Sequence, residues 1–221
     1  MARHFLRLLV GFLPASRAKS RLFRLLGWDV HDDARVSICL LWRIDHVSLA
    51  PESRIASFNV CRDLRSLDLG RGALIGSWNW ISAARGLMGL PDARAALQLG
   101  DHAVITSRHY LDTSGGITMG RHGGLAGVRT TLLSHQVDIV RCVQTVKPIT
   151  IGEYVVVSSN CQIAPGAWIA SYTVVAMGAT VVGKLPDSYR LYGGAPAKDI
   201  GPLPPDARFF SKTTNYIGTE A

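Results

Sequence analysis

The sequence predicts an all-β repeat protein, built of very short strands joined by tight corners and preceded by a small helical segment. Three observations support this prediction. Aliphatic residues recur every six positions from Ile151 onward, weaker hexads recur upstream, and apolar residues near the N-terminus follow helical spacing. With 221 residues, the chain can form a sizeable core without disulfides or metal, and a single domain is the default.

Composition narrows the class of protein. Hydrophobic residues make up 48% and charged residues 18% of the chain, which excludes a disordered or coiled-coil protein. No apolar run approaches the roughly 18 residues of a membrane span. The formal net charge of +8 favours an anionic partner, such as nucleic acid, a membrane surface or a phosphorylated small molecule. The scattered cysteines predict reduced, structural thiols in a cytosolic protein: Cys39, Cys61, Cys142 and Cys161.

Residues 1–28 are predicted to form an amphipathic helical cap. Apolar residues fall at helical spacing on both sides of Pro14: Phe5, Leu8, Leu9, Phe12 and Leu13 before it, Leu22, Leu25 and Leu26 after it. A basic face accompanies them: Arg3, Arg7, Arg17, Lys19, Arg21 and Arg24. The cap is expected to pack on the end of the main domain. A peripheral membrane contact through the apolar face and the basic rim is an alternative compatible with it.

The strongest signal is a repeat of six residues. From Ile151 the chain reads IGEYVV VSSNCQ IAPGAW IASYTV VAMGAT VVGKLP. The first position of each hexad is β-branched and aliphatic: Ile151, Val157, Ile163, Ile169, Val175 and Val181. A period of six fits neither a helix nor a long alternating strand. It predicts short strands that each place one large side chain in a narrow interior, with small residues where the chain turns.

Weaker hexads extend the repeat over most of the chain. They are marked by Leu49 and Ile55, by Leu69, Ile75 and Ile81, and by Leu99, Ile105, Leu111 and Ile117. The phase is lost between Ile55 and Leu69 and again between Ile117 and Ile151. A segment is therefore expected to loop out of the repeat at each of these two places.

The repeat, together with the terminal stretch Gly194-Ala195-Pro196-Ala197-Lys198, resembles the hexapeptide-repeat acyltransferases over residues 29 to 201. The resemblance is greatest to bacterial members that acetylate sugars of surface polysaccharides. It implies a left-handed parallel β-helix over residues 29–185, a C-terminal extension over 186–221, and a homotrimer with sites between subunits. It also implies acetyl-CoA as acyl donor, a sugar or glycan precursor as acceptor, and no metal.

His135 is the candidate catalytic base. It lies in LLSHQVD, inside the stretch where the hexad phase fails, and the resemblance places the family's catalytic histidine there. Moving an acetyl group from a thioester to a hydroxyl requires a base for the hydroxyl proton. Imidazole, with a pKa of about 6.5, suits this task near neutral pH. No Cys–His pairing is visible in the sequence, so direct attack is preferred to a covalent enzyme intermediate.

Two further residues are assigned to the reaction. Asp138, three residues after His135, is the candidate to orient its ring, although a solvated loop acid is an equal alternative. The resemblance places the backbone N–H of Ser159 where it would stabilise the oxyanion of the tetrahedral intermediate.

Binding residues follow from the resemblance as well. Arg108, His109 and Arg129 are candidates for contacts with acceptor hydroxyls or a phosphate, with outward-facing repeat positions as the alternative. Lys184 and Lys198 are candidates for the phosphates of coenzyme A. Ala176 and Gly178 lie where the family lets the pantetheine arm run along the backbone.

Other functional classes stay open at this stage. A non-catalytic β-helix scaffold would need none of these residues. A zinc enzyme similar to the γ-class carbonic anhydrases would need clustered histidines, and the spacing of the candidates lacks a close pair: His102, His109, His122 and His135. Nucleic-acid binding finds little support, because the basic residues are spread along the chain without interleaved aromatics. The expected location is the cytoplasm, with the inner face of a membrane as a further possibility.

Overall fold

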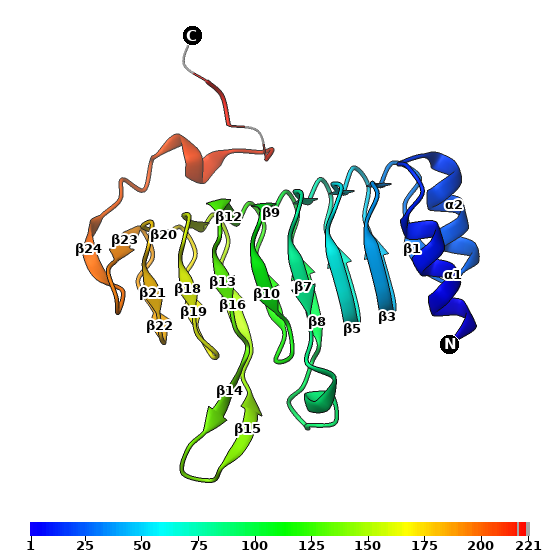
Figure 1. The fold of residues 1–221 in the computed structure, drawn as a ribbon. Helices are drawn as coiled ribbons and strands as arrows, with labels where there is room; N and C mark the ends of the chain where they lie inside the picture. Colours follow the sequence, from blue (N-terminus) through cyan, green and yellow to red (C-terminus); the bar gives the residue numbers. More distant parts are fainter. Residues whose placement is uncertain (216, 220–221) are drawn as a thin grey trace.

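The computed structural model, which describes residues 1–215 and 217–219, winds the chain into a three-sided prism of stacked coils (Figure 1). Neighbouring coils pair in parallel throughout, with the antiparallel β23–β24 pair closing the C-terminal end. The architecture is the expected left-handed parallel β-helix with an N-terminal helical cap.

The three sides of the prism are named here after a central strand. The β12 face contains β2 (Arg35–Val36), β4 (Arg54–Ile55), β6 (Leu74–Ile75), β9 (Val104–Ser107), β12 (Gly124–Val128), β17 (Val156–Val157), β20 (Val174–Val175), β23 (Arg190–Gly193) and β24 (Lys198–Pro202). The β10 face contains β7 (Trp80–Ser82), β10 (Tyr110–Asp112), β13 (Thr131–Leu132), β18 (Gln162–Ile163) and β21 (Thr180–Val181). The β11 face contains β1 (Asp29–Val30), β8 (Ala96–Leu99), β11 (Ile117–Met119), β16 (Ile149–Ile151), β19 (Trp168–Ile169) and β22 (Lys184–Leu185). The long strands β3 (Leu40–Leu49) and β5 (Val60–Leu69) bend from the β10 face onto the β11 face.

Three corners join these faces. The His135 corner connects the β10 face to the β11 face, the aromatic corner connects the β11 face to the β12 face, and the Ser159 corner connects the β12 face to the β10 face. At the aromatic corner five rings stack at successive coils: His102, His122, Tyr154, Tyr172 and Tyr189. All five have positive φ values, so each turns its coil in the left-handed region that few residues adopt.

The predicted hexad positions form the core. The six first-position residues from Ile151 to Val181 are at most 2% exposed, and the upstream positions from Leu49 to Ile117 are at most 4% exposed. Parallel pairing aligns them in rows, so that Ile75 lies between Ile55 and Ile105 on the β12 face. Each row stacks aliphatic side chains through the interior, which is why one large residue per six suffices to fill a narrow prism.

The predicted phase breaks have two different outcomes. The break between Ile117 and Ile151 contains the expected excursion, a hairpin of β14 (His135–Asp138) and β15 (Val143–Val146). The break between Ile55 and Leu69 contains no loop. There β5 passes continuously through the corner, and its inward positions Cys61 and Leu69 are eight positions apart instead of six.

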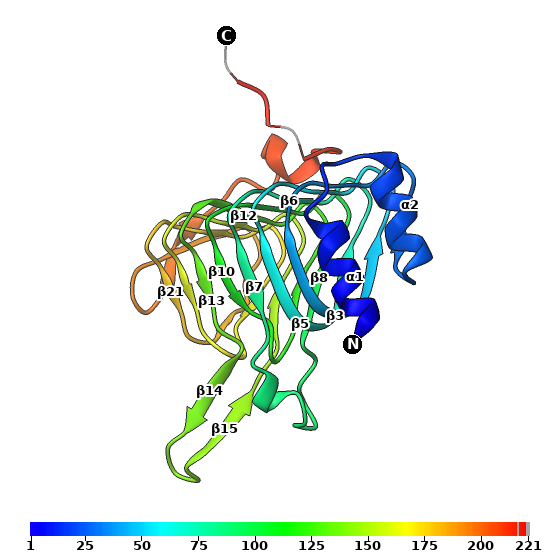
Figure 2. The same cartoon turned by 45° about the vertical axis from the view of Figure 1, so that its right-hand side comes forward.

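One further loop was not predicted from the sequence. Residues 83–95, including the short helix η1 (Arg85–Leu87), leave the prism between β7 and β8. The equivalent inward positions Ile81 and Leu99 are eighteen residues apart, a multiple of six, so the inserted segment preserves the hexad phase. This loop and the β14–β15 hairpin project from the same side of the prism (Figure 2).

The helical cap forms where the sequence predicts it, as α1 (Ala2–Gly11) and α2 (Arg17–Leu25). The Ser16 side chain accepts a hydrogen bond from the Lys19 backbone N–H and caps α2. The two helices cover the N-terminal end of the prism (Figure 1). No helix among the described residues combines the length and the apolar character needed to cross a bilayer.

Lys19 fixes this cap and gives a testable prediction. Its side chain is 1% exposed, and Nζ donates hydrogen bonds to the carbonyls of Gly11, Leu13 and Ser37. The Lys19→Met variant keeps the bulk but leaves three carbonyls without their donor, so the free energy of unfolding should fall by about 3 kcal/mol. Urea unfolding measures it. The exposed Arg21→Met on the same helix is the matched control and should change stability by less than about 0.5 kcal/mol.

The predicted C-terminal extension begins as part of the prism. Its strand β23 still pairs in parallel with β20, and β24 then turns back antiparallel on β23. After β24 the chain returns over the aromatic corner through the short helix η2 (Arg208–Ser211). Phe210 packs edge-on against Tyr172 and Tyr189, and the Tyr154 hydroxyl donates to the carbonyl of Lys212.

Candidate active site

His135 stands at the neck of the β14–β15 hairpin, where the chain leaves the prism. The neck is held closed by Ser134, which is fully buried. Its carbonyl accepts from the Lys147 backbone N–H at 2.8 Å, and its hydroxyl accepts from the Gly115 backbone N–H at 2.9 Å. The hairpin therefore begins from a rigid coil, and the His135 side chain is 34% exposed.

The ring of His135 is paired with Asp112. The distance from Nδ1 to Oδ2 of Asp112 is 2.7 Å, and the carboxylate is only 5% exposed. An ionised carboxylate accepts, so Nδ1 carries the proton and Nε2 keeps its lone pair. No described residue forms a hydrogen bond with Nε2. A histidine with one nitrogen fixed by a buried carboxylate and the other free has the arrangement of a general base.

Asp112 is itself held by a network of donors. Its carboxylate accepts from the hydroxyls of Ser114 at 2.5 Å and Ser134 at 3.0 Å, and from the Ser134 backbone N–H at 2.8 Å. Burial alone would raise the pKa of Asp112, but the hydrogen bonds from Ser114, His135 and Ser134 lower it below its usual value. The carboxylate is therefore ionised at neutral pH.

The predicted partner, Asp138, does not contact His135. Its carboxylate accepts from the side chain of Arg141 at 2.7 Å and from the Arg141 backbone N–H at 3.0 Å. These hydrogen bonds lower the pKa of Asp138. In the antiparallel hairpin, residue 138 lies three positions farther from the neck than residue 135, so the assignment from sequence proximity is wrong and Asp112 takes this place.

The loop at 83–95 lies against the same site. Ser114, which bonds Asp112, also accepts from the backbone N–H of Ala84 and so ties this loop to the pair. A small apolar cluster joins the loop to the hairpin: Leu87, Ala93 and Val146, with Ala84 and Leu90 packed against it. The two projecting segments therefore hold each other on the side of the prism where His135 lies.

Gly115 gives a prediction about this neck. A Cβ at residue 115 would lie 2.6 Å from the Lys147 carbonyl oxygen and 2.7 Å from that of Ser134. The Gly115→Ala variant should therefore push the neck open and lower the free energy of unfolding by about 1–3 kcal/mol. Thermal unfolding measures it. Gly86→Ala, where a Cβ meets nothing within 4 Å, is the control and should unfold near the wild-type temperature.

Ser159 lies at a different corner from His135. Its hydroxyl accepts from the Val128 backbone N–H at 3.1 Å and fills the space beside Gly127, where a Cβ would lie 1.7 Å from Oγ. The backbone N–H of Ser159 donates no hydrogen bond to any described residue. It is available to a ligand, but within one chain the prism separates it from His135.

Several predicted binding residues share the Ser159 corner. Arg108 and Arg129 are exposed there, at successive coils joined by the hydrogen bond from the Arg129 backbone N–H to the Arg108 carbonyl. Gly178 follows on the other side of Ser159, whose carbonyl accepts from its backbone N–H at 3.0 Å. Two predicted residues adjoin this group: Ala176 in the same corner and Lys198 in β24, paired with Gly193.

His109 is a correction. It is 2% exposed, its Nδ1 accepts from the Thr130 backbone N–H, and its Nε2 faces the Thr106 hydroxyl at 2.9 Å. It continues a buried column of asparagines, since its own backbone N–H donates to Asn79 Oδ1. Burial lowers the pKa of His109 to about 4, so the ring is neutral. Both nitrogens are occupied inside the coil, and the predicted contact with acceptor is wrong.

Lys184 lies near the His135 corner, on the β11 face. A surface depression there is lined by residues that the sequence analysis did not single out, along with Lys184: Lys147, Pro148, Gly166, Trp168 and Pro186. Lys147 belongs to the neck of the His135 hairpin, so the depression adjoins the candidate base. The predicted donor-binding residues thus fall into two groups, one at each of two corners.

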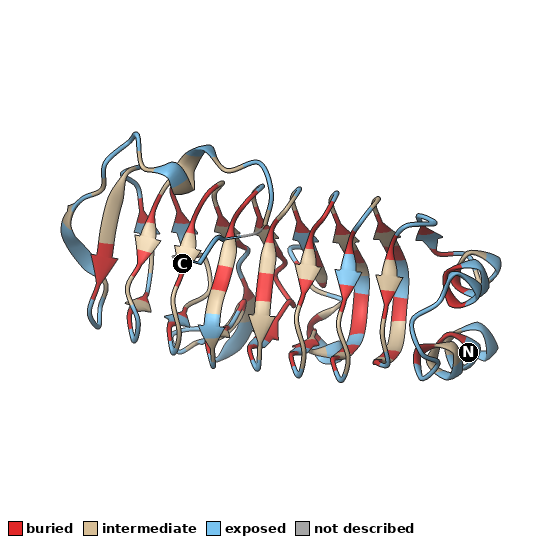
Figure 3. Ribbon diagram, turned by 90° about the horizontal axis from the view of Figure 1, so that it is seen from above, coloured by how far each residue is buried: buried red, intermediate tan, exposed pale blue. Residues whose placement is uncertain are grey.

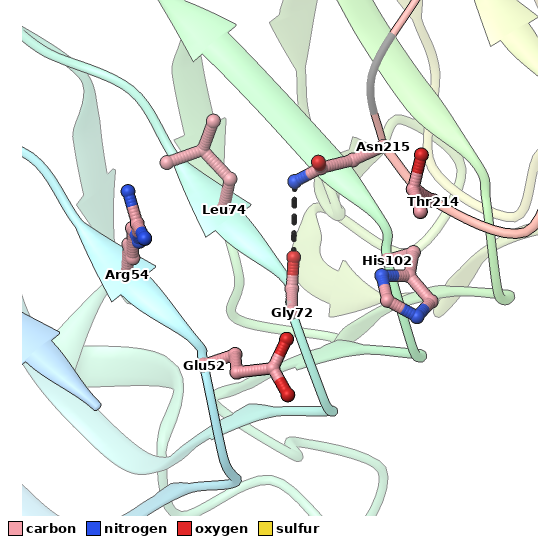
Figure 4. Close-up of a pocket in the computed structure, with 7 residues that line it drawn as sticks. All are labelled: Glu52, Arg54, Gly72, Leu74, His102, Thr214 and Asn215. Carbon is pink, nitrogen blue, oxygen red and sulfur yellow. Dashed lines mark hydrogen bonds between the residues drawn. The ribbon is translucent and has the colours of Figure 1, made fainter. Parts of the chain in front are cut away.

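Another depression lies away from this site, at the aromatic corner (Figure 4). Glu52, Arg54 and His102 line it, and the Asn215 side chain donates to the Gly72 carbonyl at 3.1 Å across it. His102 stacks on His122 with 5.1 Å between ring centroids, within the aromatic column. None of the residues predicted to act on substrate lines this depression.

Solved structures with a similar fold were found by comparison. No protein-family model and no curated protein matches the chain in sequence. A hexapeptide-repeat acetyltransferase from Vibrio cholerae, solved with acetyl-CoA, is 23% identical over 61% of this chain and 70% of its own, with a TM-score of 0.51. AntD, an N-acyltransferase from Bacillus cereus solved with dTDP and 3-hydroxybutyryl-CoA, is 13% identical over 86% and 92%, with a TM-score of 0.56.

A maltose O-acetyltransferase from Clostridium difficile is 15% identical over 61% of this chain and 68% of its own, with a TM-score of 0.51. At these identities the likeness establishes the fold alone. The chain has the architecture of the hexapeptide-repeat acyltransferases, as the resemblance in its sequence predicts.

Proposed function

We propose that the protein transfers an acetyl group from acetyl-CoA to a hydroxyl of a sugar or glycan precursor, with His135 as general base. The observation that carries the proposal is the His135–Asp112 pair, fixed at 2.7 Å with Nε2 free, at the neck of a hairpin on this fold. Supporting it, three solved proteins of the same fold are acyltransferases, two of them with a coenzyme A thioester bound.

The free Nε2 of His135 defines the proposed acetyl-transfer reaction. Nε2 removes the proton of the acceptor hydroxyl as its oxygen attacks the thioester carbonyl, and Asp112 stabilises the imidazolium that forms. The C–S bond then breaks, and the proton on Nε2 passes to the departing thiolate. The N–H of Ser159 is proposed to donate to the intermediate oxyanion. Asp112 touches His135 rather than substrate, so it is a positioning residue.

Direct attack on the thioester fits the environment of the cysteines. Burial raises the pKa values of Cys39, Cys61 and Cys161, which are at most 1% exposed. A buried thiol is a poor nucleophile. Cys142 is exposed but lies toward the far end of the hairpin. All four are free thiols, which supports a reducing compartment such as the cytoplasm.

We propose a homotrimer because the predicted site residues occupy two corners of one chain. His135 and Lys184 lie on one side, whereas Ser159, Gly178 and Arg129 lie at another corner. A three-fold arrangement of parallel prisms would bring one corner of each chain to the other corner of its neighbour. Acetyl-CoA would then lie between copies, with its phosphates within reach of Lys184 or Lys198. Sedimentation should show a trimer, and a fully active monomer would contradict this arrangement.

The acyl-transfer proposal is tested by release of coenzyme A thiol from acetyl-CoA. The acceptor panel contains nucleotide sugars, amino sugars, lipid-linked sugars and small alcohols, and acetylated products are identified by mass. The proposal expects turnover with a sugar acceptor that depends on His135. Failure to bind acetyl-CoA at all, or transfer unchanged in the His135→Ala variant, would favour a non-catalytic scaffold.

A further inference from the structure

The helical cap turns its apolar side to solvent. On α1 and the turn after it the exposed apolar residues follow a single helical stripe, and α2 exposes two further leucines. They are between 38% and 83% exposed: Phe5, Leu6, Leu9, Phe12, Leu13, Leu22 and Leu25. The outer surface of both helices is correspondingly exposed in Figure 3. Exposing this many large apolar side chains to water on two short helices is unfavourable. Such a surface is typical of a site that binds another molecule or a membrane.

The inner side of the cap combines the buried Phe23, which belongs to the hydrophobic core, with charged groups and close backbone contacts. Arg7 is 5% exposed and donates to the carbonyls of Leu26 and Ile44, and its guanidinium stacks on Trp28 at 4.9 Å. Beside it, a Cβ at Gly11 would lie 2.7 Å from the Cys39 carbonyl oxygen. Together with the buried Lys19, these contacts lock the helices with their apolar stripe outward. Rotating α1 to bury the stripe would leave a guanidinium and several carbonyls without partners.

The rim of this apolar surface is cationic. Residues 1–28 contain six lysines and arginines and no acidic residue. Two of the six are buried under the helices, but Arg3, Arg17 and Arg21 are exposed beside the apolar stripe. Two acids outside the cap, Asp32 and Asp45, pair with Arg24 and His4 and leave these three arginines without an acidic ion-pair partner among the described residues. An apolar stripe flanked by such arginines is complementary to a surface where anionic headgroups overlie hydrocarbon.

We propose that the cap, defined as residues 1–28, docks flat on an anionic phospholipid bilayer, with Phe5, Leu9 and Phe12 inserted among the acyl chains. A second copy of the chain is the less favourable occupant, because pairing two caps would bring the exposed Arg3, Arg17 and Arg21 of each copy close to those of the other. The proposal is independent of the acyl-transfer chemistry.

Vesicle flotation of the full-length protein tests the proposal. Wild-type protein should float with phosphatidylcholine–phosphatidylglycerol vesicles and much less with phosphatidylcholine alone, and high salt should weaken its binding. Leu9→Glu combined with Phe12→Glu should weaken binding at least about tenfold. Neutralising Arg3, Arg17 and Arg21 with glutamine should weaken it by about fivefold for each charge. Far-UV circular dichroism checks that each variant keeps its fold.

The matched control changes two other exposed apolar residues, at the tip of the β14–β15 hairpin. Ile139→Glu combined with Val140→Glu, at sites 82% and 96% exposed, should bind vesicles like the wild type. The proposal fails if the Leu9→Glu/Phe12→Glu variant binds like the wild type, or if the hairpin variant alone loses binding. It also fails if the cap variant instead abolishes a self-association seen by sedimentation without lipid, which would make a second copy the occupant.

Discussion

The His135→Ala variant is expected to lose about 10²- to 10⁴-fold in kcat for acetyl transfer, the usual contribution of a positioned general base. Without Nε2 the acceptor hydroxyl must lose its proton to water while its oxygen attacks the thioester. Acetyl-CoA affinity should change little, because the imidazole contacts the reacting oxygen and not the nucleotide. Steady-state kinetics on the acceptor found in the panel measures kcat, and calorimetry measures acetyl-CoA binding.

His46 supplies the control for this experiment. It is exposed on β3, away from the hairpin, and His46→Ala should keep the wild-type kcat. A His135→Ala enzyme with more than half of the wild-type activity would show that another group removes the proton.

The Asp112→Asn variant is expected to lower kcat by about 10- to 100-fold, with a smaller change in KM. The amide keeps the shape of the carboxylate but removes the charge that stabilises the imidazolium, and a hydrogen bond to a charged group is worth about 1.5–3 kcal/mol. Asp138→Asn is the matched control, since Asp138 bonds Arg141 and not His135. If Asp138→Asn were the more damaging of the two, the assigned pair would be wrong.

The Asp112→Asn variant should also change how the free energy of unfolding depends on pH. Because hydrogen bonds hold the pKa of Asp112 in the folded protein below its usual value of 3.8, the carboxylate contributes to the free energy of unfolding above that pH. This contribution is lost as the pH falls through the lowered value. Asp112→Asn should therefore destabilise the protein at neutral pH and progressively less in acid below pH 3.8. Urea unfolding at several pH values separates this structural effect from the loss in kcat.

The repeat could be predicted from the sequence because the same packing requirement recurs every six residues. Each short strand must place one aliphatic side chain in the interior, and the aligned rows through Ile75 and Ile163 confirm this. The hairpin after Leu132 was predicted because it breaks the phase. The loop at 83–95 was hidden because its insertion preserves the phase, and only the stacking of Leu99 on Leu69 and Met119 reveals it.

The candidate active site could be predicted only in part. His135 was assigned from the resemblance, which places the family's catalytic histidine in the stretch where the hexad phase fails, and in the structure its ring is paired with a buried carboxylate. Asp112 was missed because it precedes His135 by 23 residues and meets it only when one coil stacks on the next. In sequence, its signal was weak: an acid ahead of Ser114 and two glycines at the end of a hexad. The burial of His109 was not predicted, because hexad spacing alone does not reveal that its corner continues a column of asparagines.

The helical cap shows a second limit of prediction from sequence, which concerns the orientation of its helices. Helical spacing interrupted at Pro14 predicted a helical cap with an apolar and a basic face, and the structure forms this cap from α1 and α2. The orientation of those sides depends on Arg7 and Lys19, which turn inward to bond carbonyls of the cap and the first coils. Hydrophobic periodicity assigns the apolar side to the core by default. Hydrogen bonds to the prism reverse that assignment for most of the apolar residues of α1, whereas Phe23 of α2 still packs into the core.

A crystal structure of the protein with bound coenzyme A is the decisive test of His135 as the catalytic base, because it requires no knowledge of the acceptor. The thiol sulfur should lie beside Nε2 of His135, in a cleft between two copies of the chain, with the Ser159 N–H of the neighbouring copy facing the thioester position. Coenzyme A bound at the aromatic corner, or with its sulfur remote from His135, would show that His135 is not the base.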